Sequence, residues 1–160
     1  MNFSIVRFFN TYGEGQVAQF VITKWVLSVL KGENPIVYGD GRQLRSYGHV
    51  EDVIEGLKLI LQNSISNGKT YNLGNSSQIK TLNELAQLVI DIVAPSTELK
   101  VEILESFDGA DRNADREIHT RYCDTSLANK ELGYNPKISV EEGIKRIAAQ
   151  AKIHQDWPKS

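Results

Sequence analysis

Cysteine is nearly absent from this sequence, with Cys123 as the only one among 160 residues. A single thiol cannot form a disulfide within the chain, and it excludes a metal site built from several cysteines. Long apolar runs are missing as well, so no segment is suited to span a membrane, and residues 1–8 lack the basic and apolar regions of a signal peptide. We therefore expect a cytoplasmic protein with no membrane span and no metal site.

An excess of positive charge is also lacking. The chain carries 18 Lys and Arg residues against 20 Asp and Glu residues, which gives a formal net charge of −2 at pH 7. Proteins that bind nucleic acids usually present a strongly basic surface, so this class is not expected here. A length of 160 residues with 41% hydrophobic residues predicts one folded domain with a sizeable core.

Patterns typical of helices and strands alternate along the chain. Apolar residues at helical spacing predict helices over residues 16–31, 50–61, 82–93, 124–132 and 140–153. Short apolar or alternating runs predict strands over residues 3–9, 35–38, 70–73 and 98–104. This alternation predicts the α/β class. The strands are few and far apart, which is typical of the edge of a sheet with a small subdomain.

Local signals mark where several of these elements begin and end. Thr81-x-x-Glu84 and Ser139-x-x-Glu142 are capping boxes that predict two helix starts. Residues 106–116 are interpreted as a polar loop, and residues 154–160 as a frayed tail.

The loop after the first predicted strand contains Gly13-x-Gly15-x-x-Ala18, which formally matches the fingerprint of a dinucleotide-binding loop. In such a loop the first glycine follows the strand directly, and an acid about 20 residues later ends the second strand. Here three residues separate the predicted strand from Gly13, and Glu33 precedes a strand instead of ending one. Glu14 would also place a carboxylate beside the pyrophosphate. We interpret the glycines as residues that let the chain turn from strand to helix.

Four motifs occur in a fixed order along the chain. They are "RFFNTYGEGQ" from Arg7, "VYGDGRQLRSYGHVEDV" from Val37, "YNLGNSS" with "TLNELAQLV" from Tyr71, and "DRNADREIHTRYCDTSLANKELGYNPKISVEEGI" from Asp111. Together they resemble the carboxy-terminal half of the NAD-dependent nucleotide-sugar epimerase/dehydratase family, the extended short-chain dehydrogenases. The resemblance extends from about residue 4 to about residue 148.

The resemblance implies that the two halves of the complete enzyme have different roles. A Rossmann half binds NAD, and a Tyr-x-x-x-Lys pair takes a proton from a sugar hydroxyl. None of the six tyrosines in this chain is followed by a lysine four residues later. We therefore predict no catalytic residue here and no activity of the chain alone, with the cofactor NAD bound mainly by a missing N-terminal half.

On this interpretation residues 1–160 form a single substrate-binding domain that includes the last strands of a truncated Rossmann sheet. Residues 3–9 would be a central strand of the complete sheet, and their backbone groups and apolar side chains would be left bare on one edge. We expect a homo-oligomer contact or an N-terminal partner segment to cover this edge.

The resemblance implies that the ligand, a nucleotide-diphosphate (NDP) sugar, is held by two arginines. Arg45 matches the family arginine that contacts the diphosphate, and Arg112 matches a second one that approaches from a distant loop. A guanidinium group suits a diphosphate because it forms bidentate, charge-assisted hydrogen bonds. A surface salt bridge is the alternative for either residue.

Four further residues follow from the same resemblance. Asp115 matches an acid that binds the ribose hydroxyls, and a pairing with the neighbouring Arg116 is the alternative. Asn10 matches an asparagine of the sugar-phosphate region, and its amide offers donors and an acceptor. Val37 and Tyr38 would border the base.

Three aromatic residues have two interpretations each. Phe8 and Phe9 match positions that line the nicotinamide pocket in related enzymes, and two core phenylalanines are the alternative. Tyr47 reaches a phosphate or only packs. His49 and His119 match no catalytic position of the family, so we interpret them as structural.

For the whole chain, two functions stay open. The alternative to a part of an enzyme is a non-catalytic module that binds nucleotide sugars or pairs with a relative.

Overall fold

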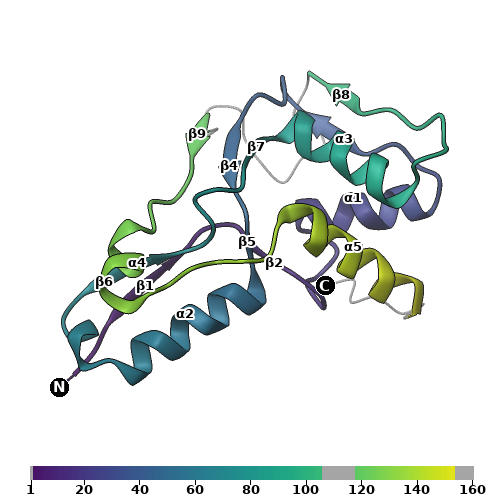
Figure 1. Ribbon diagram of the computed structural model, residues 1–160. Coiled ribbons are helices and arrows are strands. Elements are labelled where there is room, and N and C mark those ends of the chain that lie inside the picture. Colours follow the sequence, from purple (N-terminus) through teal and green to yellow (C-terminus); the bar gives the residue numbers. More distant parts are fainter. Residues whose placement is uncertain (1, 106–117, 154–160) are drawn as a thin grey trace.

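The computed structural model of the protein describes residues 2–105 and 118–153. These residues form helices and short strands in two halves, which confirms the predicted α/β class (Figure 1). None of the helices within them is long and apolar enough to cross a membrane. The predicted loop over residues 106–116 and the tail over residues 154–160 lie outside the described residues.

The half at the lower left of Figure 1 is built on two parallel strands. β1 (Ile5–Phe8) pairs with β6 (Thr70–Leu73), and the helices α2 (Val50–Gln62) and α4 (Ser126–Leu132) lie beside them. The short 3-10 helix η1 (Ser64–Ser66) leads from α2 toward β6. The buried apolar residues of this half are Val53, Ile60, Tyr71, Leu73, Ala128, Leu132 and Tyr134.

β1 is a strand, as predicted, but its side chains are not buried in this chain. Phe3, Ile5 and Phe8 are 53, 50 and 57% exposed. Within the described residues β1 pairs with β6 alone, so no strand lies along its other edge. This exposure agrees with the expectation that the apolar side chains of this strand are left bare on one edge.

The other half contains three helices that pack against one another. They are α1 (Val21–Leu30), α3 (Leu82–Val93) and α5 (Val140–Ile153). The strand β3 (Ile36–Tyr38) contacts α3 and pairs in parallel with β8 (Glu102–Leu104). The larger buried side chains between the helices include Ile22, Trp25, Val26, Leu85, Val89, Ile144 and Ile147.

The helix ends follow the sequence signals with one exception. Thr81 and Glu84 form the predicted capping box at the start of α3. Gly133 ends α4 with φ at 72°, a left-handed conformation that glycine adopts without strain. The exception is α1, which begins at Val21 and not near residue 16. The preceding residues form turns, with the N–H of Phe20 bonded to the carbonyl of Val17 at 3.3 Å.

Several very short strands were not evident from the sequence pattern. β2 (Thr11–Tyr12) pairs with β5 (Gly48–His49), and β4 (Leu44–Ser46) lies between β7 (Ile79–Thr81) and β9 (Thr120–Arg121). Runs of two or three residues are too short for an alternating pattern to be recognised. Pairing between segments distant in sequence makes them strands.

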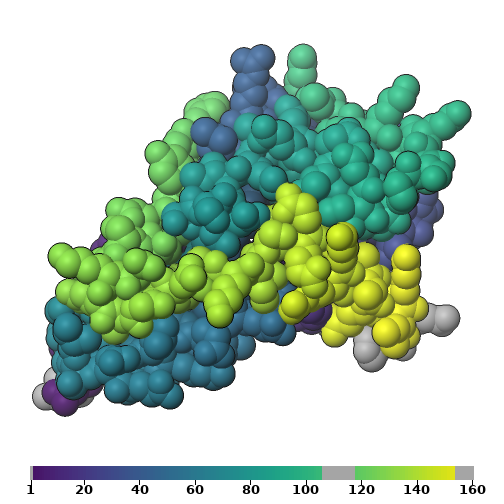
Figure 2. Space-filling view, viewed as in Figure 1, coloured from purple at the N-terminus to yellow at the C-terminus, as the bar shows by residue number. Residues whose placement is uncertain are grey.

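The segment between α4 and α5 joins the two halves. Figure 2 shows it as a green band that crosses this face, between α2 and the segment that leads into α3. The carboxylate of Asp52 on α2 is buried and accepts the N–H groups of Lys137 and Ile138, both at 2.9 Å. The N–H of Val140 donates to Oε1 of Gln78 at 3.1 Å. These bonds fix the start of α5, while the single domain over residues 1–160 stays a prediction.

Candidate functional site

A cavity of about 360 Å³ lies beside α1. Its walls come from the ends of β1 and β2, from α1 and β3, and from β4 and β9. Six of the residues predicted from the sequence line it, namely Phe8, Asn10, Val37, Tyr38, Arg45 and Tyr47. The fold thus brings most of the predicted residues to one place, and their binding roles stay predictions.

Three predicted residues are not part of this wall. Phe9 does not line the cavity; its N–H is bonded to the carbonyl of Leu73 at 3.0 Å, and its side chain lies against Gly74. This position favours packing over a cofactor contact for Phe9. Arg112 and Asp115 lie outside the described residues, so their roles stay predictions.

Arg45 is buried in the cavity wall. Its Nη1 donates to the carbonyl oxygens of Leu44 at 2.8 Å and His119 at 3.3 Å. These bonds hold the guanidinium plane in place. Because arginine stays protonated in proteins, the wall carries a permanent positive charge, which suits an anionic ligand.

The pairing of β9 with β4 places a second arginine beside Arg45. In this parallel register Arg45 lies opposite Arg121, and both residues line the cavity. Two guanidinium groups in one cavity wall suit an anionic ligand that lies between them. Arg121 was missed in the sequence because no local pattern reveals that β9 pairs with β4. It supplies the described site with a second cation, in addition to the predicted Arg112.

Asn10 has an unusual backbone for its position at the end of β1. Its φ is 38°, and it is the only residue other than glycine with a positive φ in the described ranges. Its Nδ2 donates to the carbonyl of Ser46 at 2.8 Å, and its Oδ1 accepts from Nη2 of Arg121 at 3.4 Å. Asparagine tolerates this conformation better than most residues, and such strain often marks functional positions.

The far end of the cavity is apolar and aromatic. Trp25 is fixed by a bond from its Nε1 to the carbonyl of Ile36 at 2.9 Å. Nζ of Lys24 lies 5.9 Å from the centre of the Tyr38 ring. Aromatic side chains with a few polar groups are typical of a pocket for a flat organic ring.

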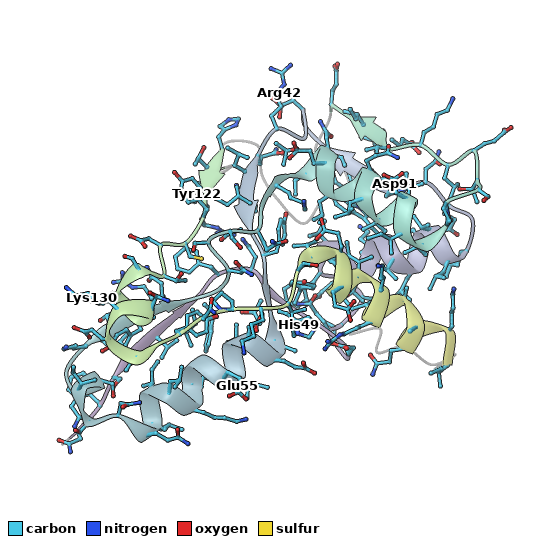
Figure 3. All side chains as sticks on the ribbon, in the orientation of Figure 1. Arg42, His49, Glu55, Asp91, Tyr122 and Lys130 are labelled. Atoms are coloured by element: carbon cyan, nitrogen blue, oxygen red, sulfur yellow. The ribbon has the colours of Figure 1, made fainter. Side chains whose placement is uncertain are left out.

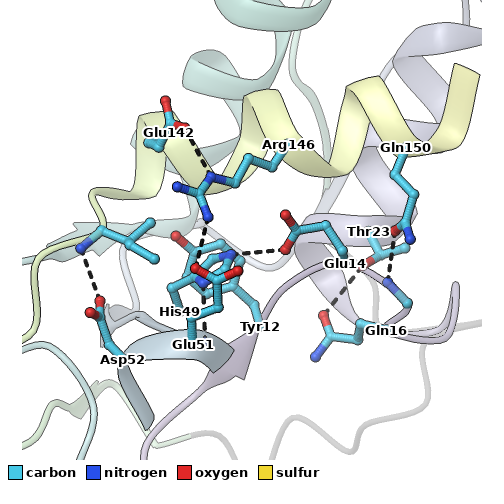
Figure 4. Close-up of polar contacts among 12 residues, drawn as sticks. Tyr12, Glu14, Gln16, Thr23, His49, Glu51, Asp52, Glu142, Arg146 and Gln150 are labelled. Carbon is cyan, nitrogen blue, oxygen red and sulfur yellow. Dashed lines mark hydrogen bonds and ion pairs between the residues drawn. The ribbon is translucent and has the colours of Figure 1, made fainter. Parts of the chain in front are cut away.

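The glycine loop has its own partners inside the protein (Figure 4). The N–H of Gly15 donates to Oε1 of Gln150 on α5 at 2.9 Å, and the carboxylate of Glu14 lies 3.0 Å from Nε2 of His49. A Cβ atom on Gly13 would lie 2.5 Å from a methyl group of α2, so only glycine fits there. These contacts support a strand-to-helix turn and leave no cradle for a pyrophosphate in this loop.

His49 has the contacts of a structural residue. It is fully buried, and its Nδ1 accepts the N–H of Glu51 at 3.3 Å, which caps α2. The Tyr12 ring lies edge-on to it, with ring centres 5.4 Å apart. The Tyr12 hydroxyl donates to the carbonyl of Ser139 at 3.2 Å, and burial raises the pKa of Tyr12. Tyr12 lines the cavity as a neutral phenol, not as a base.

No chemistry is indicated for the remaining candidates. Burial raises the pKa of the Cys123 thiol, whose Sγ accepts from the Ser46 hydroxyl at 3.4 Å. Within residues 2–105 and 118–153, no group of three or more His, Cys, Asp or Glu side chains is placed to hold a metal ion.

The fold and the cavity define this chain as part of a Rossmann-type α/β protein of the nucleotide-sugar epimerase and dehydratase type. It belongs to the family described as GDP-mannose 4,6 dehydratase, whose model matches residues 1–147. The resemblance found in the sequence is thereby confirmed.

Relatives and solved structures agree with this family. The chain is 33% identical over 147 residues to UDP-glucuronic acid decarboxylase 1 of Arabidopsis thaliana. Its fold is similar to that of a double mutant of the dTDP-glucose 4,6-dehydratase DesIV of Streptomyces venezuelae with NAD bound, at a TM-score of 0.82 and 27% identity. The UDP-glucuronic acid 4-epimerase of Bacillus cereus, in complex with UDP-glucuronic acid and NAD, shares the fold at a TM-score of 0.80 and 22% identity.

The chain spans less than half the length of these proteins. The match to the decarboxylase covers 91% of this chain and 31% of the relative. The match to the dehydratase structure covers 96% of this chain and 45% of the other, and the match to the epimerase covers 94% and 45%.

Proposed function

We propose that this chain is the substrate-binding part of an NAD-dependent nucleotide-sugar epimerase or dehydratase, and that its cavity holds the nucleotide diphosphate of an NDP-sugar. The observation that carries the proposal is the register of Arg45 with Arg121 inside a cavity that also has an aromatic end. Membership of the family supports the same ligand class.

Each part of the ligand has a counterpart among the proposed residues. The diphosphate lies between Arg45 and Arg121, which supply two positive charges. The base lies against Val37 and Tyr38 at the aromatic end. The sugar lies toward Asn10, where the strained backbone presents an amide to hydroxyl groups.

Three further residues complete the proposed set for the same ligand. Arg112 adds a third cation to the diphosphate, and Asp115 accepts hydrogen bonds from the ribose hydroxyls. Tyr47, buried in the wall beyond Arg45, lines the phosphate region.

We propose that NAD contacts this chain only at the end of β1. The glycine loop is filled by contacts to α2 and α5, so it does not fit a pyrophosphate. Phe8, which is exposed and lines the cavity, is the residue that faces the nicotinamide ring. NAD supplies hydride transfer when it is bound, and the parts of the relatives that this chain does not span hold most of it.

Calorimetric titration with UDP-, dTDP-, GDP- and CDP-sugars tests the proposal, with UDP-sugars first because the plant relative carries a UDP-sugar name. We expect Arg45→Lys to weaken binding about 10- to 100-fold, because a lysine keeps the charge and loses the bidentate fork. Arg42→Lys is the matched control, since Arg42 points into solvent in Figure 3 and does not line the cavity.

Absence of heat with every nucleotide sugar, from a chain that is folded by circular dichroism, would show the proposal to be wrong. Binding without turnover, after the chain is joined to an N-terminal Rossmann half that carries the Tyr-x-x-x-Lys pair, would favour the non-catalytic module instead.

A further inference from the structure

The chain at β4 presents three alternate side chains to the cavity. Gln43, Arg45 and Tyr47 all line it and are 2, 5 and 3% exposed. Side chains two residues apart in an extended segment lie on the same face. The hydroxyl of Ser46 lies on the other face, where it donates to Sγ of Cys123. Gln43 therefore belongs to the same wall as Arg45.

Gln43 has an unusual feature for a buried amide. Its Oε1 accepts no hydrogen bond from any group in the described residues, although the side chain is almost completely buried. Folded proteins rarely leave a buried amide oxygen without a donor. Because Gln43 lines a cavity, a ligand is the natural source of that donor.

The ligand group that meets Oε1 of Gln43 must carry a hydrogen atom. An amide oxygen only accepts hydrogen bonds. The oxygens of a diphosphate at neutral pH are acceptors too, so they do not pair with it. The donors that a nucleotide offers are its ribose hydroxyls and the N–H groups of its base.

The position of Gln43 along the wall agrees with this assignment. Asn10, at the proposed sugar end, bonds to the carbonyl of Ser46, which follows Arg45 in the chain. Gln43 precedes Arg45, about 7 Å away along the extended segment. It thus lies toward the turn that leads from β3, whose Val37 and Tyr38 form the proposed base end.

We infer that Gln43 selects the ligand through its nucleoside, by accepting a hydrogen bond from a ribose hydroxyl or from a base N–H. The inference rests on the proposed function and adds a specificity residue that contacts the nucleoside and not the phosphates. Oε1 has already lost its water on folding, so a ligand donor restores a hydrogen bond without further desolvation of the protein.

The test compares UDP with analogues that each lack one donor. Calorimetry of the whole chain is carried out with UDP, 2′-deoxy-UDP, 2′,3′-dideoxy-UDP and 3-methyl-UDP, and with inorganic pyrophosphate. We expect one class of analogue, deoxy or 3-methyl, to bind the wild type roughly 10-fold more weakly than UDP. In Gln43→Met, which keeps the volume and removes the amide oxygen, UDP and that analogue should bind equally.

Pyrophosphate binding distinguishes the contact of Arg45 with the phosphates from the contact of Gln43 with the nucleoside. Gln43→Met should bind it as the wild type does, whereas Arg45→Lys should bind it more weakly. Equal wild-type affinity for UDP and all three analogues would overturn the inference, and this comparison needs no variant to fold. A loss of pyrophosphate binding in folded Gln43→Met would also overturn it. If no nucleoside diphosphate binds the wild type, the proposed function is wrong together with the inference.

Discussion

Gly143 lets α5 approach the cavity wall closely. A Cβ atom at this position would lie 2.3 Å from Oη and 2.5 Å from Cε2 of Tyr12, a buried residue that lines the cavity. Glycine inside a helix costs about 1 kcal/mol relative to alanine. At this position the absence of a side chain matters more than helix propensity, since the atoms in the way belong to a buried ring.

We expect Gly143→Ala to lower the free energy of unfolding by about 1–3 kcal/mol, because overpacking outweighs the gain in helix propensity. UDP binding should weaken as well, since the Tyr12 ring must move. Urea denaturation followed by circular dichroism measures the first effect, and calorimetry the second. Ala149→Gly, exposed on the same helix, measures propensity alone and should cost about 1 kcal/mol. A Gly143→Ala protein more stable than the wild type would contradict the close contact.

At the scale of elements, Glu131 attaches α4 to β6. Its Oε1 lies 2.7 Å from Nζ of Lys69, and its Oε2 accepts from the Tyr71 hydroxyl at 2.6 Å. The bond from Lys69, followed by the bond from Tyr71, lowers the pKa of Glu131. Burial, with a smaller effect of Glu131, raises the pKa of Tyr71 to about 12. Near neutral pH the carboxylate is therefore charged and the phenol is neutral.

This contact predicts a dependence of stability on pH. A carboxyl whose pKa is lower in the folded state stabilises the fold above its ordinary value of 4.5, and that contribution is lost as the pH falls through the folded value. We expect Glu131→Gln to lower the free energy of unfolding at pH 7 and to match the wild type near pH 3. Urea denaturation at several pH values between 3 and 7 measures the difference.

Glu55→Gln is the control for this series. Glu55 is exposed on α2 and pairs with exposed Lys58, three residues away, so its loss should change stability little at any pH. A Glu131→Gln difference that is as large at pH 3 as at pH 7 would mean that the ion pair is not its source.

At the scale of the whole molecule, β1 remains an open edge. Its apolar side chains Phe3, Ile5 and Phe8 are about half exposed, and the described residues provide no strand beside it other than β6. Bare strand edges with apolar side chains tend to pair with another chain. The proposed partner is a second copy of the chain or the N-terminal segment of the complete enzyme.

We expect the chain alone to associate, and Ile5→Lys to shift it toward the monomer, because a charge on an edge strand opposes pairing. Size-exclusion chromatography with light scattering over a range of concentrations measures the mass. Leu61→Lys, which places the same charge on an exposed residue of α2, should not change it. A wild-type chain that is a stable monomer at all concentrations would count against the covered edge.

Much of the fold was predictable because its causes are local. The helices from Val50, Leu82 and Val140 follow apolar spacing, and the Thr81–Glu84 capping box needs only its own residues. The start of α1 was predicted too early, because apolar residues before Val21 continue the helical pattern although the backbone there forms turns.

Part of the candidate site was also predictable from the sequence, and part was not. Family motifs in the sequence were enough to name Asn10, Val37, Tyr38 and Arg45, which the fold collects around one cavity. Only the tertiary structure places Arg121 opposite Arg45 and leaves the buried amide oxygen of Gln43 without a donor among the described residues. The physical reason is that strand register and burial depend on contacts between distant segments, and a local pattern of residues carries no information about them.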